Sequence, residues 1–121
     1  MPGRHLAAAL LGLLLAVGAS ASAFAQNLTG VWVGNDGGTY YVRQINQVVW
    51  WYGENALFAP GFSNVAKGEV SQGQVFLLWA DVPKGRTSSN GALVLQIQSP
   101  TRLVALQRTG GFGGSVWTRI R

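Results

Sequence analysis

Four acidic side chains set the acid–base chemistry that this sequence of 121 residues can offer, and they are Asp36, Glu54, Glu69 and Asp81. Two carboxylates placed on either side of a glycosidic bond can act as general acid and as base or nucleophile. Asp36 and Asp81, for instance, would form such a pair if both lie at the mouth of the fold. A carboxylate-dependent hydrolase is therefore one hypothesis, ranked third behind two binding hypotheses given below.

Other catalytic side chains are scarce. The one histidine is His5, near the start of the chain, and there is no cysteine. Imidazole bases, thiolate nucleophiles and the usual zinc or copper ligand sets are thus missing after residue 25. We expect a protein that is not an enzyme, with no catalytic residues, no metal site and no cofactor. It is also disulfide-free, so its stability must come from packing.

The first 25 residues have the layout of an export signal. Arg4 and His5 give a positive start, residues 6–17 form an apolar run, and Ala23-Phe24-Ala25 is a small-x-small cleavage pattern. The apolar run is shorter than the roughly 20 residues that span a bilayer. We predict a signal peptide over residues 1–25, export to the periplasm or the medium, and no transmembrane segment after cleavage.

Residues 26–121 are enough for one domain and too few for two. The net charge of the whole chain is +5. After the signal, the basic side chains are scattered and form no run: Arg43, Lys67, Lys84, Arg86, Arg102, Arg108, Arg119 and Arg121. Scattered positive charge is typical of a solvated surface, so we expect no nucleic-acid partner.

The rest of the chain alternates eight short runs of β-branched and aromatic residues with turn residues. No stretch shows helical periodicity long enough to compete. The predicted strands are residues 29–34, 39–45, 48–53, 62–70, 74–80, 92–98, 102–109 and 115–120.

The predicted connections alternate between two classes. Those after the first, third, fifth and seventh strands are mostly long or rich in glycine, whereas the others are tight turns: Asn46-Gln47, Ser71-Gln72-Gly73 and Ser99-Pro100-Thr101. In an up-and-down meander, alternate loops lie at the same end. The sequence therefore predicts an all-β, eight-stranded antiparallel up-and-down barrel, with polar loops around one mouth. A small twisted β-sandwich is the alternative.

Two predicted strands, at residues 48–52 and 75–79, are apolar on both faces. A barrel whose outside faces water would alternate apolar and polar residues. We therefore expect something to cover the outer face. The paired aromatics Tyr40-Tyr41 and Trp50-Trp51 would suit a contact between copies of the chain, which predicts a homo-oligomer.

Residues 30–42 resemble the first hairpin of the avidins, and Gly30-x-Trp32 resembles the opening strand of the lipocalins. Both groups belong to the calycin superfamily of β-barrels, so the resemblance implies a calycin-like barrel. The matching positions are Gly30, Trp32, Gly37, Thr39, Tyr40 and Val42.

The resemblance has one departure and one further implication. Avidins carry an asparagine and a serine that bind the biotin ureido oxygen, whereas this chain has Gly34 and Gly38, so biotin binding is not implied. Lipocalins place an arginine of a late strand against the opening tryptophan. Here Arg119 or Arg121 would stack on Trp32 and plug the closed end.

An eight-stranded barrel is either filled by side chains or holds one small ligand. Alternation from Trp32 places Gly34 inward near the mouth, where with Gly38 it clears space. The ligand-binding site would have aromatic walls and polar groups at its rim. Its predicted residues are Asn35, Asp36, Tyr40, Trp50, Asn64, Trp79 and Asp81. Trp51 is the alternative to Trp50. The opposing interpretation is that the aromatics simply fill the barrel.

The leading hypothesis is an exported, non-enzymatic protein that holds a small, partly apolar molecule at the loop-lined mouth. The alternative is a protein-interaction module, such as an envelope structural subunit or an inhibitor, with a filled barrel.

Overall fold

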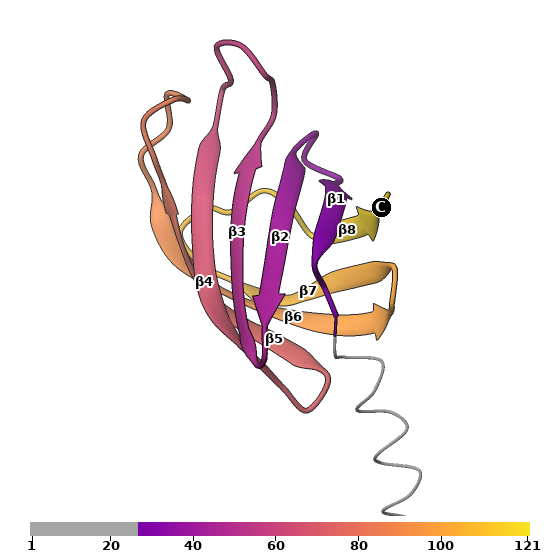
Figure 1. The fold of residues 1–121 in the computed structure, drawn as a ribbon. Helices are drawn as coiled ribbons and strands as arrows, with labels where there is room; N and C mark the ends of the chain where they lie inside the picture. Colours follow the sequence, from indigo (N-terminus) through magenta and orange to yellow (C-terminus); the bar gives the residue numbers. More distant parts are fainter. Residues whose placement is uncertain (1–26) are drawn as a thin grey trace, which may run out of the picture.

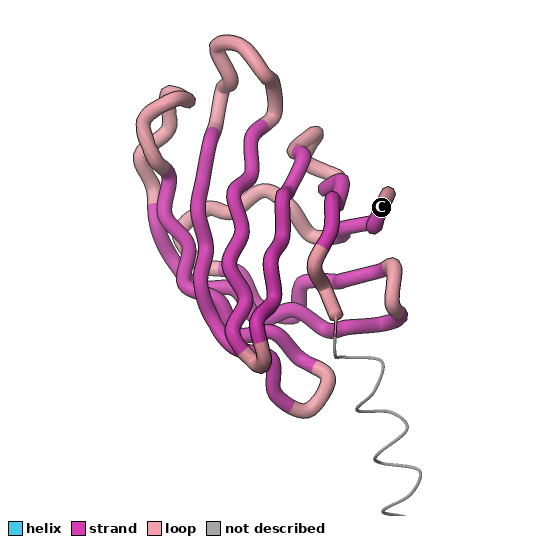
Figure 2. The backbone as a smooth tube through the Cα atoms, viewed as in Figure 1, coloured by secondary structure: helices cyan, strands magenta, loops and turns pink. Residues whose placement is uncertain are grey.

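The computed structural model describes residues 27–121, and the predicted signal peptide lies outside them. This part of the chain contains no helix (Figure 2), and so none that is long and apolar enough to cross a membrane. Its strands are β1 (Gly30–Gly34), β2 (Thr39–Ile45), β3 (Val48–Glu54), β4 (Ser63–Ser71), β5 (Gln74–Asp81), β6 (Asn90–Ser99), β7 (Arg102–Arg108) and β8 (Val116–Arg119).

The eight strands follow one another around a single closed sheet, and every neighbouring pair is antiparallel (Figure 1). The first strand, β1, pairs with both β2 and β8, which closes the barrel. The predicted all-β class, strand number and up-and-down order are confirmed, and the sandwich alternative is wrong. Each strand begins and ends within two residues of its predicted bounds.

The two ends of the barrel carry different connections, with tight turns at one end and the other loops at the opposite end. Gln72 and Gly73 join β4 to β5 with φ angles of 52° and 76°. Positive φ at both central residues is what a type I′ hairpin turn requires, and its twist matches that of the strands. The loops after β1, β3 and β5 stand together at the upper end of the barrel in Figure 2.

The closed end is plugged by Trp32, which is fully buried. Its indole nitrogen donates a hydrogen bond to the Leu28 carbonyl at 2.9 Å. The guanidinium of Arg119 lies 5.8 Å from the centre of the Trp32 ring and donates to the carbonyls of Asn27 and Thr29. Arg119 therefore makes the stacking contact predicted for the late-strand arginine, and Trp32 belongs to the plug.

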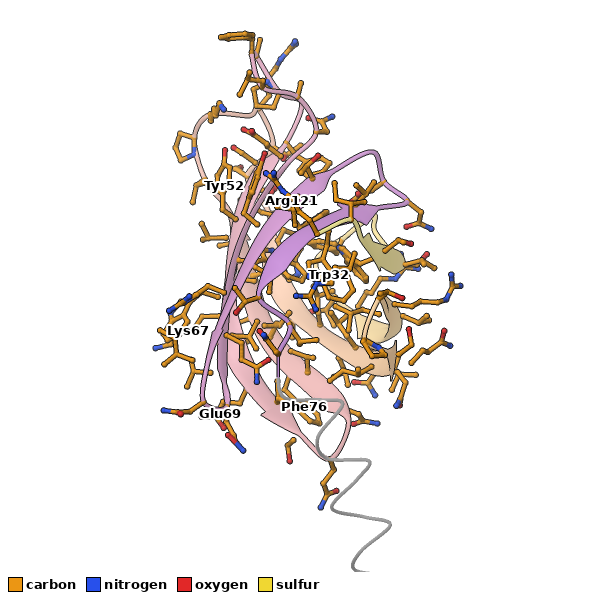
Figure 3. The ribbon with its side chains drawn as sticks, turned by 45° about the vertical axis from the view of Figure 1, so that its right-hand side comes forward. Trp32, Tyr52, Lys67, Glu69, Phe76 and Arg121 are labelled. Atoms are coloured by element: carbon orange, nitrogen blue, oxygen red, sulfur yellow. The ribbon has the colours of Figure 1, made fainter. Side chains whose placement is uncertain are left out.

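The outer face of β3, β4 and β5 carries large apolar side chains. Trp50, Val65, Phe76 and Leu78 point outward, and Leu78 is 72% exposed. Two shallow grooves of about 350 and 390 Å³ run along this face and share Lys67 and Leu78. Figure 3 shows Lys67 and Glu69 pointing away from the barrel, whereas Trp32 points into it. We call the surface formed by Trp50, Val65, Phe76 and Leu78 the outer apolar face.

Candidate functional site

A cavity of about 340 Å³ opens at the loop-bearing end of the barrel, and we call it the mouth cavity. All four long connections, or the strand ends beside them, contribute to its lining. Four of the seven predicted binding residues line it: Asp36, Asn64, Trp79 and Asp81. The others, Asn35, Tyr40 and Trp50, do not.

Asn35 ties the β1–β2 loop to the last strand. Its side-chain oxygen accepts hydrogen bonds from the backbone nitrogens of Ser115 and Val116 at 2.8 and 3.2 Å, and its side-chain nitrogen donates to the Ser115 hydroxyl at 2.8 Å. Asn35 is exposed, and its polar atoms already have protein partners. These bonds anchor the loop that also carries Asp36.

Trp51, not Trp50, is the inward-facing tryptophan of β3. Trp51 is buried and donates from its indole nitrogen to Asn64 Oδ1 at 2.9 Å. Trp50 faces outward, where the ammonium nitrogen of Lys67 lies 5.9 Å from its ring centre. The predicted placement of Trp50 in the cavity wall is therefore corrected, because successive strand residues point to opposite faces and Trp51 takes the inner one.

Tyr40 fills the space that three glycines leave. A Cβ added to Gly34, Gly38 or Gly53 would come within 2.9, 2.7 and 2.4 Å of the Tyr40 ring. Gly34 and Gly38 were expected to clear room for a ligand, and the structure shows that a protein side chain takes it. Tyr40 is fully buried, does not line the cavity, and packs against Phe112, which does.

The Tyr40 hydroxyl fixes the carboxylate of Asp36. It donates to Asp36 Oδ2 at 2.5 Å, and the Gly38 nitrogen donates to Asp36 Oδ1 at 2.9 Å. Burial raises the pKa of the Tyr40 hydroxyl well above its ordinary value, and the hydrogen bond to Asp36 raises it further. Tyr40 thus stays protonated and remains a donor.

Asp81 orders the β5–β6 loop from the opposite side of the mouth. Its Oδ2 accepts a hydrogen bond from the Ser89 nitrogen at 2.9 Å. The same loop is anchored by Ser63, a fully buried residue whose hydroxyl donates to the Val82 carbonyl at 2.7 Å and accepts from the Gly85 nitrogen at 2.8 Å. The loop that supplies Thr87 and Ser89 to the cavity is therefore held in place.

An ion pair between the buried Glu54 and the exposed Lys84 lies at the same end of the barrel. Glu54 is 7% exposed and accepts hydrogen bonds from the Lys84 ammonium at 2.5 Å and from the Tyr52 hydroxyl at 3.0 Å. The Lys84 hydrogen bond lowers the pKa of the Glu54 carboxyl, and Glu54 in turn raises the pKa of Lys84. The pair joins β3 to the β5–β6 loop, and neither residue is part of the cavity lining.

Phe112 is the main residue that the sequence reasoning missed. It comes from the β7–β8 connection, which crosses the barrel from one side to the other (Figure 1). Its ring is buried and meets Trp79 edge to face, with centroids 4.9 Å apart. Arg108 holds the loop by donating to the carbonyls of Phe112, Gly113 and Gly114 at 3.2 to 3.3 Å. The sequence signal for this insertion is that Phe112 is the one aromatic residue in a loop made mostly of glycine.

Trp117 completes the aromatic cluster beneath the cavity. Its ring lies 5.7 Å from Trp51 and 6.0 Å from both Tyr40 and Phe112, centroid to centroid. Its indole nitrogen is buried and has no hydrogen-bond partner among residues 27–121. The nitrogen lies close enough to the Tyr40 hydroxyl to lower its pKa, but the geometry falls short of a hydrogen bond.

The site therefore combines three aromatic side chains, two carboxylates and several hydroxyl or amide groups around one opening. Asp36 and Asp81 do lie in the same cavity, as the hydrolase hypothesis requires. When the chain was compared with protein-family models, with curated proteins and with solved structures, no match was found.

Proposed function

We propose that this protein is a non-enzymatic binding protein that holds one small, partly apolar molecule in the mouth cavity. The observation that carries the proposal is the cavity itself, which is lined from all four connections at this end of the barrel. The barrel interior below it is filled by aromatic side chains, as the opposing interpretation expected, so the proposal places the ligand at the mouth and not inside the barrel. Its volume of about 340 Å³ is at the lower end of the range for small-molecule sites. Such sites are mostly apolar with a few convergent polar groups, and Phe62, Trp79 and Phe112 supply the apolar surface here.

The mouth is organised before any ligand arrives, which favours binding. Phe112 of the lining packs on three buried rings, Tyr40, Trp51 and Trp117, and the centroids of these four rings lie between 4.9 and 6.4 Å apart. The β5–β6 loop is tied to β4 by the partly buried hydrogen bonds of Ser63. A site that is already ordered loses less conformational entropy on binding.

We also propose that the barrel is calycin-like and that the protein is exported. Support for the calycin relationship comes from the resemblance over residues 30–42, the closed up-and-down barrel, and the stacking of Arg119 on Trp32. Support for export comes from the signal-like pattern of residues 1–25. The protein would then bind its ligand in the periplasm or the medium.

Native mass spectrometry of protein purified from the cells that make it tests the proposed function. A small-molecule mass should leave when the protein is denatured. Gly113→Trp should lose that mass, because a Cβ at Gly113 meets nothing closer than the Asp36 Cβ at 3.9 Å and the added ring would occupy the mouth. Ser71→Trp adds the same ring to an exposed site at the opposite end and should keep the mass. A wild-type protein that is bare and that also binds no added small molecule would overturn the proposal.

A second candidate function has an observation of its own. The outer apolar face exposes Leu78 by 72% and Phe76 by 46%, on strands that are otherwise well paired. Contiguous apolar surface of this kind marks protein contact sites. We therefore propose, as the alternative, a protein-interaction module that self-associates through the outer apolar face.

A further inference from the structure

We infer that the mouth cavity binds a small organic cation, an ammonium ion that carries an apolar or aromatic group, with Asp36 and Asp81 as its counter-charges. This inference rests on the proposed binding function of the cavity and adds the chemical class of the ligand. Three features support it: the sign of the charge at the mouth, the way the two carboxylates are held, and the aromatic surface beside them.

The charge at the mouth is opposite to that of the whole protein. The chain carries nine basic and four acidic side chains, yet the cavity lining includes two carboxylates and no lysine or arginine. The one ion pair among residues 27–121 joins Lys84 to Glu54, so neither Asp36 nor Asp81 has an ion-pair partner there. A cavity lined by charges of one sign concentrates ligands of the opposite sign and repels those of the same sign.

The cations near the mouth do not cancel this charge. Lys84 is bound to Glu54 at 2.5 Å. Arg108 donates to the backbone carbonyls of the β7–β8 loop. Arg86 is an exposed residue of the β5–β6 loop and does not line the cavity. Two half-buried carboxylates thus face the opening without a protein counter-charge.

Both carboxylates are held in fixed positions by uncharged donors. Asp36 accepts hydrogen bonds from the Gly38 nitrogen and the Tyr40 hydroxyl, one on each oxygen. Asp81 accepts from the Ser89 nitrogen on Oδ2. These donors orient the negative charges and do not neutralise them, so a cationic ligand would meet a prepared site.

The aromatic surface of the cavity suits the same ligand. Trp79 and Phe112 both line the cavity, and their rings meet edge to face at 4.9 Å. The Trp79 indole nitrogen already donates to the Thr109 carbonyl at 3.2 Å, so Trp79 offers the ligand its ring and no polar atom. Aromatic rings attract ammonium groups through their faces, and they also pack against the apolar part of such a ligand.

Three soluble probes of nearly equal size separate charge from shape: 2-phenylethylammonium, 2-phenylethanol and phenylacetate. Their binding to the purified protein is measured by isothermal titration calorimetry. We expect the cation to bind about tenfold more tightly than the alcohol or better, because the Coulomb attraction at partly buried sites exceeds that in water. The anion should bind more weakly than either, and added salt should weaken binding of the cation only.

Two variants assign the preference to the mouth. Asp81→Asn removes one negative charge but keeps an oxygen that can accept the Ser89 hydrogen bond, so it should fold and lose most of the preference for the cation. Glu69→Gln removes the same charge from the exterior of β4 and should keep the preference.

The outcomes separate the two proposals. Equal binding of the cation and the alcohol, or a preference unchanged in Asp81→Asn, would overturn the cation inference and leave the binding function standing. If none of the probes binds, the charge of the molecule released in native mass spectrometry decides: a cation supports the inference, and a neutral or anionic molecule overturns it. A bare protein that also binds no probe would overturn both proposals.

Discussion

Two tryptophans in the same buried cluster differ in what their indole nitrogens contact. Trp51 donates to the buried side-chain oxygen of Asn64, whereas the Trp117 nitrogen has no partner in the described part of the chain. When a substitution removes one partner of a buried hydrogen bond, the other partner is left unpaired, and the folded state loses stability by the desolvation penalty of that group. Removing a buried group that has no partner carries no such penalty. The two positions therefore offer a matched test of the buried polar network below the mouth.

We predict that Trp51→Phe destabilises the protein by about 1 to 2 kcal/mol more than Trp117→Phe does. Both variants lose the same ring atoms from fully packed positions, but only Trp51→Phe leaves Asn64 Oδ1 without its donor. Urea unfolding of the two variants and the wild type measures the difference. Equal losses, or a larger loss for Trp117→Phe, would contradict the assigned hydrogen bond.

The Glu54–Lys84 pair predicts a specific pH dependence of stability. Because the hydrogen bond from Lys84 lowers the pKa of Glu54 in the folded state, the pair's contribution is full above the unfolded pKa of a glutamate, about 4.3. It is then lost as the pH falls through the lower folded pKa. The free energy of unfolding of Lys84→Met should thus lie below that of the wild type at pH 7, and the gap should close at acidic pH.

Urea unfolding at a series of pH values between 7 and 3 measures that gap. Lys67→Met is the matched control, because Lys67 is exposed on the exterior of β4 and forms no ion pair within residues 27–121. The difference in free energy of unfolding between Lys67→Met and the wild type should not close as the pH falls. A gap for Lys84→Met that is as large at pH 3 as at pH 7 would show that the ion pair does not stabilise the fold.

The β7–β8 connection acts as part of the barrel's filling as well as a loop. It inserts Phe112 among the buried rings of Tyr40, Trp51, Trp79 and Trp117. Arg108 fixes the loop backbone from β7. Since Phe112 also lines the mouth cavity, this one loop couples stability to the shape of the site.

Phe112→Ala should lower the free energy of unfolding by about 3 kcal/mol and should weaken ligand binding. Phe58→Ala is the control, because Phe58 lies in another loop of the same end and is 83% exposed. Its effect should stay within about 0.5 kcal/mol. Thermal or chemical unfolding of both variants provides the comparison, and similar losses would show that Phe112 does not pack into the barrel in solution.

The hairpin register explains both a success and a miss of the sequence reasoning. The turn at Asn46-Gln47 pairs Ile45 with Val48, which places Val42 opposite Trp51 on the inner face. Trp32 faces inward and pairs with Tyr40, so Tyr40 and Val42 also face inward. Because the turn places Trp51 opposite Val42, this register would have selected Trp51 instead of Trp50. Strand number, bounds and order were predictable because turn residues and period-two patterns are local signals.

The shape of the mouth was not predictable in the same way. Gly34 and Gly38 signal that something approaches closely, but they do not say whether it is a ligand or the ring of Tyr40. The contributions of Phe62, Thr87, Ser89 and Phe112 depend on loop conformations, which follow no sequence period. Asp36, Asn64, Trp79 and Asp81 were found because each lies within two residues of a strand end.

The outer apolar face presents large apolar side chains to solvent on the outside of the closed barrel. If the protein-interaction candidate is correct, the wild type should form a defined oligomer in light scattering coupled to size exclusion, and Leu78→Lys should dissociate it. Leu106→Lys, at an exposed position on β7, should leave it intact. A monomeric wild type would remove this candidate.

Five tryptophans report on five places in the molecule, which allows the most direct test of binding at the mouth. The indole N–H signals of the ¹⁵N-labelled protein would be recorded while a small-molecule extract of the producing cells is added. We predict that the Trp79 signal shifts, whereas the signals of Trp32 in the plug and Trp50 on the outer face stay in place. A shift confined to Trp50, or no shift of any indole signal, would contradict the proposal that the mouth cavity binds a small molecule.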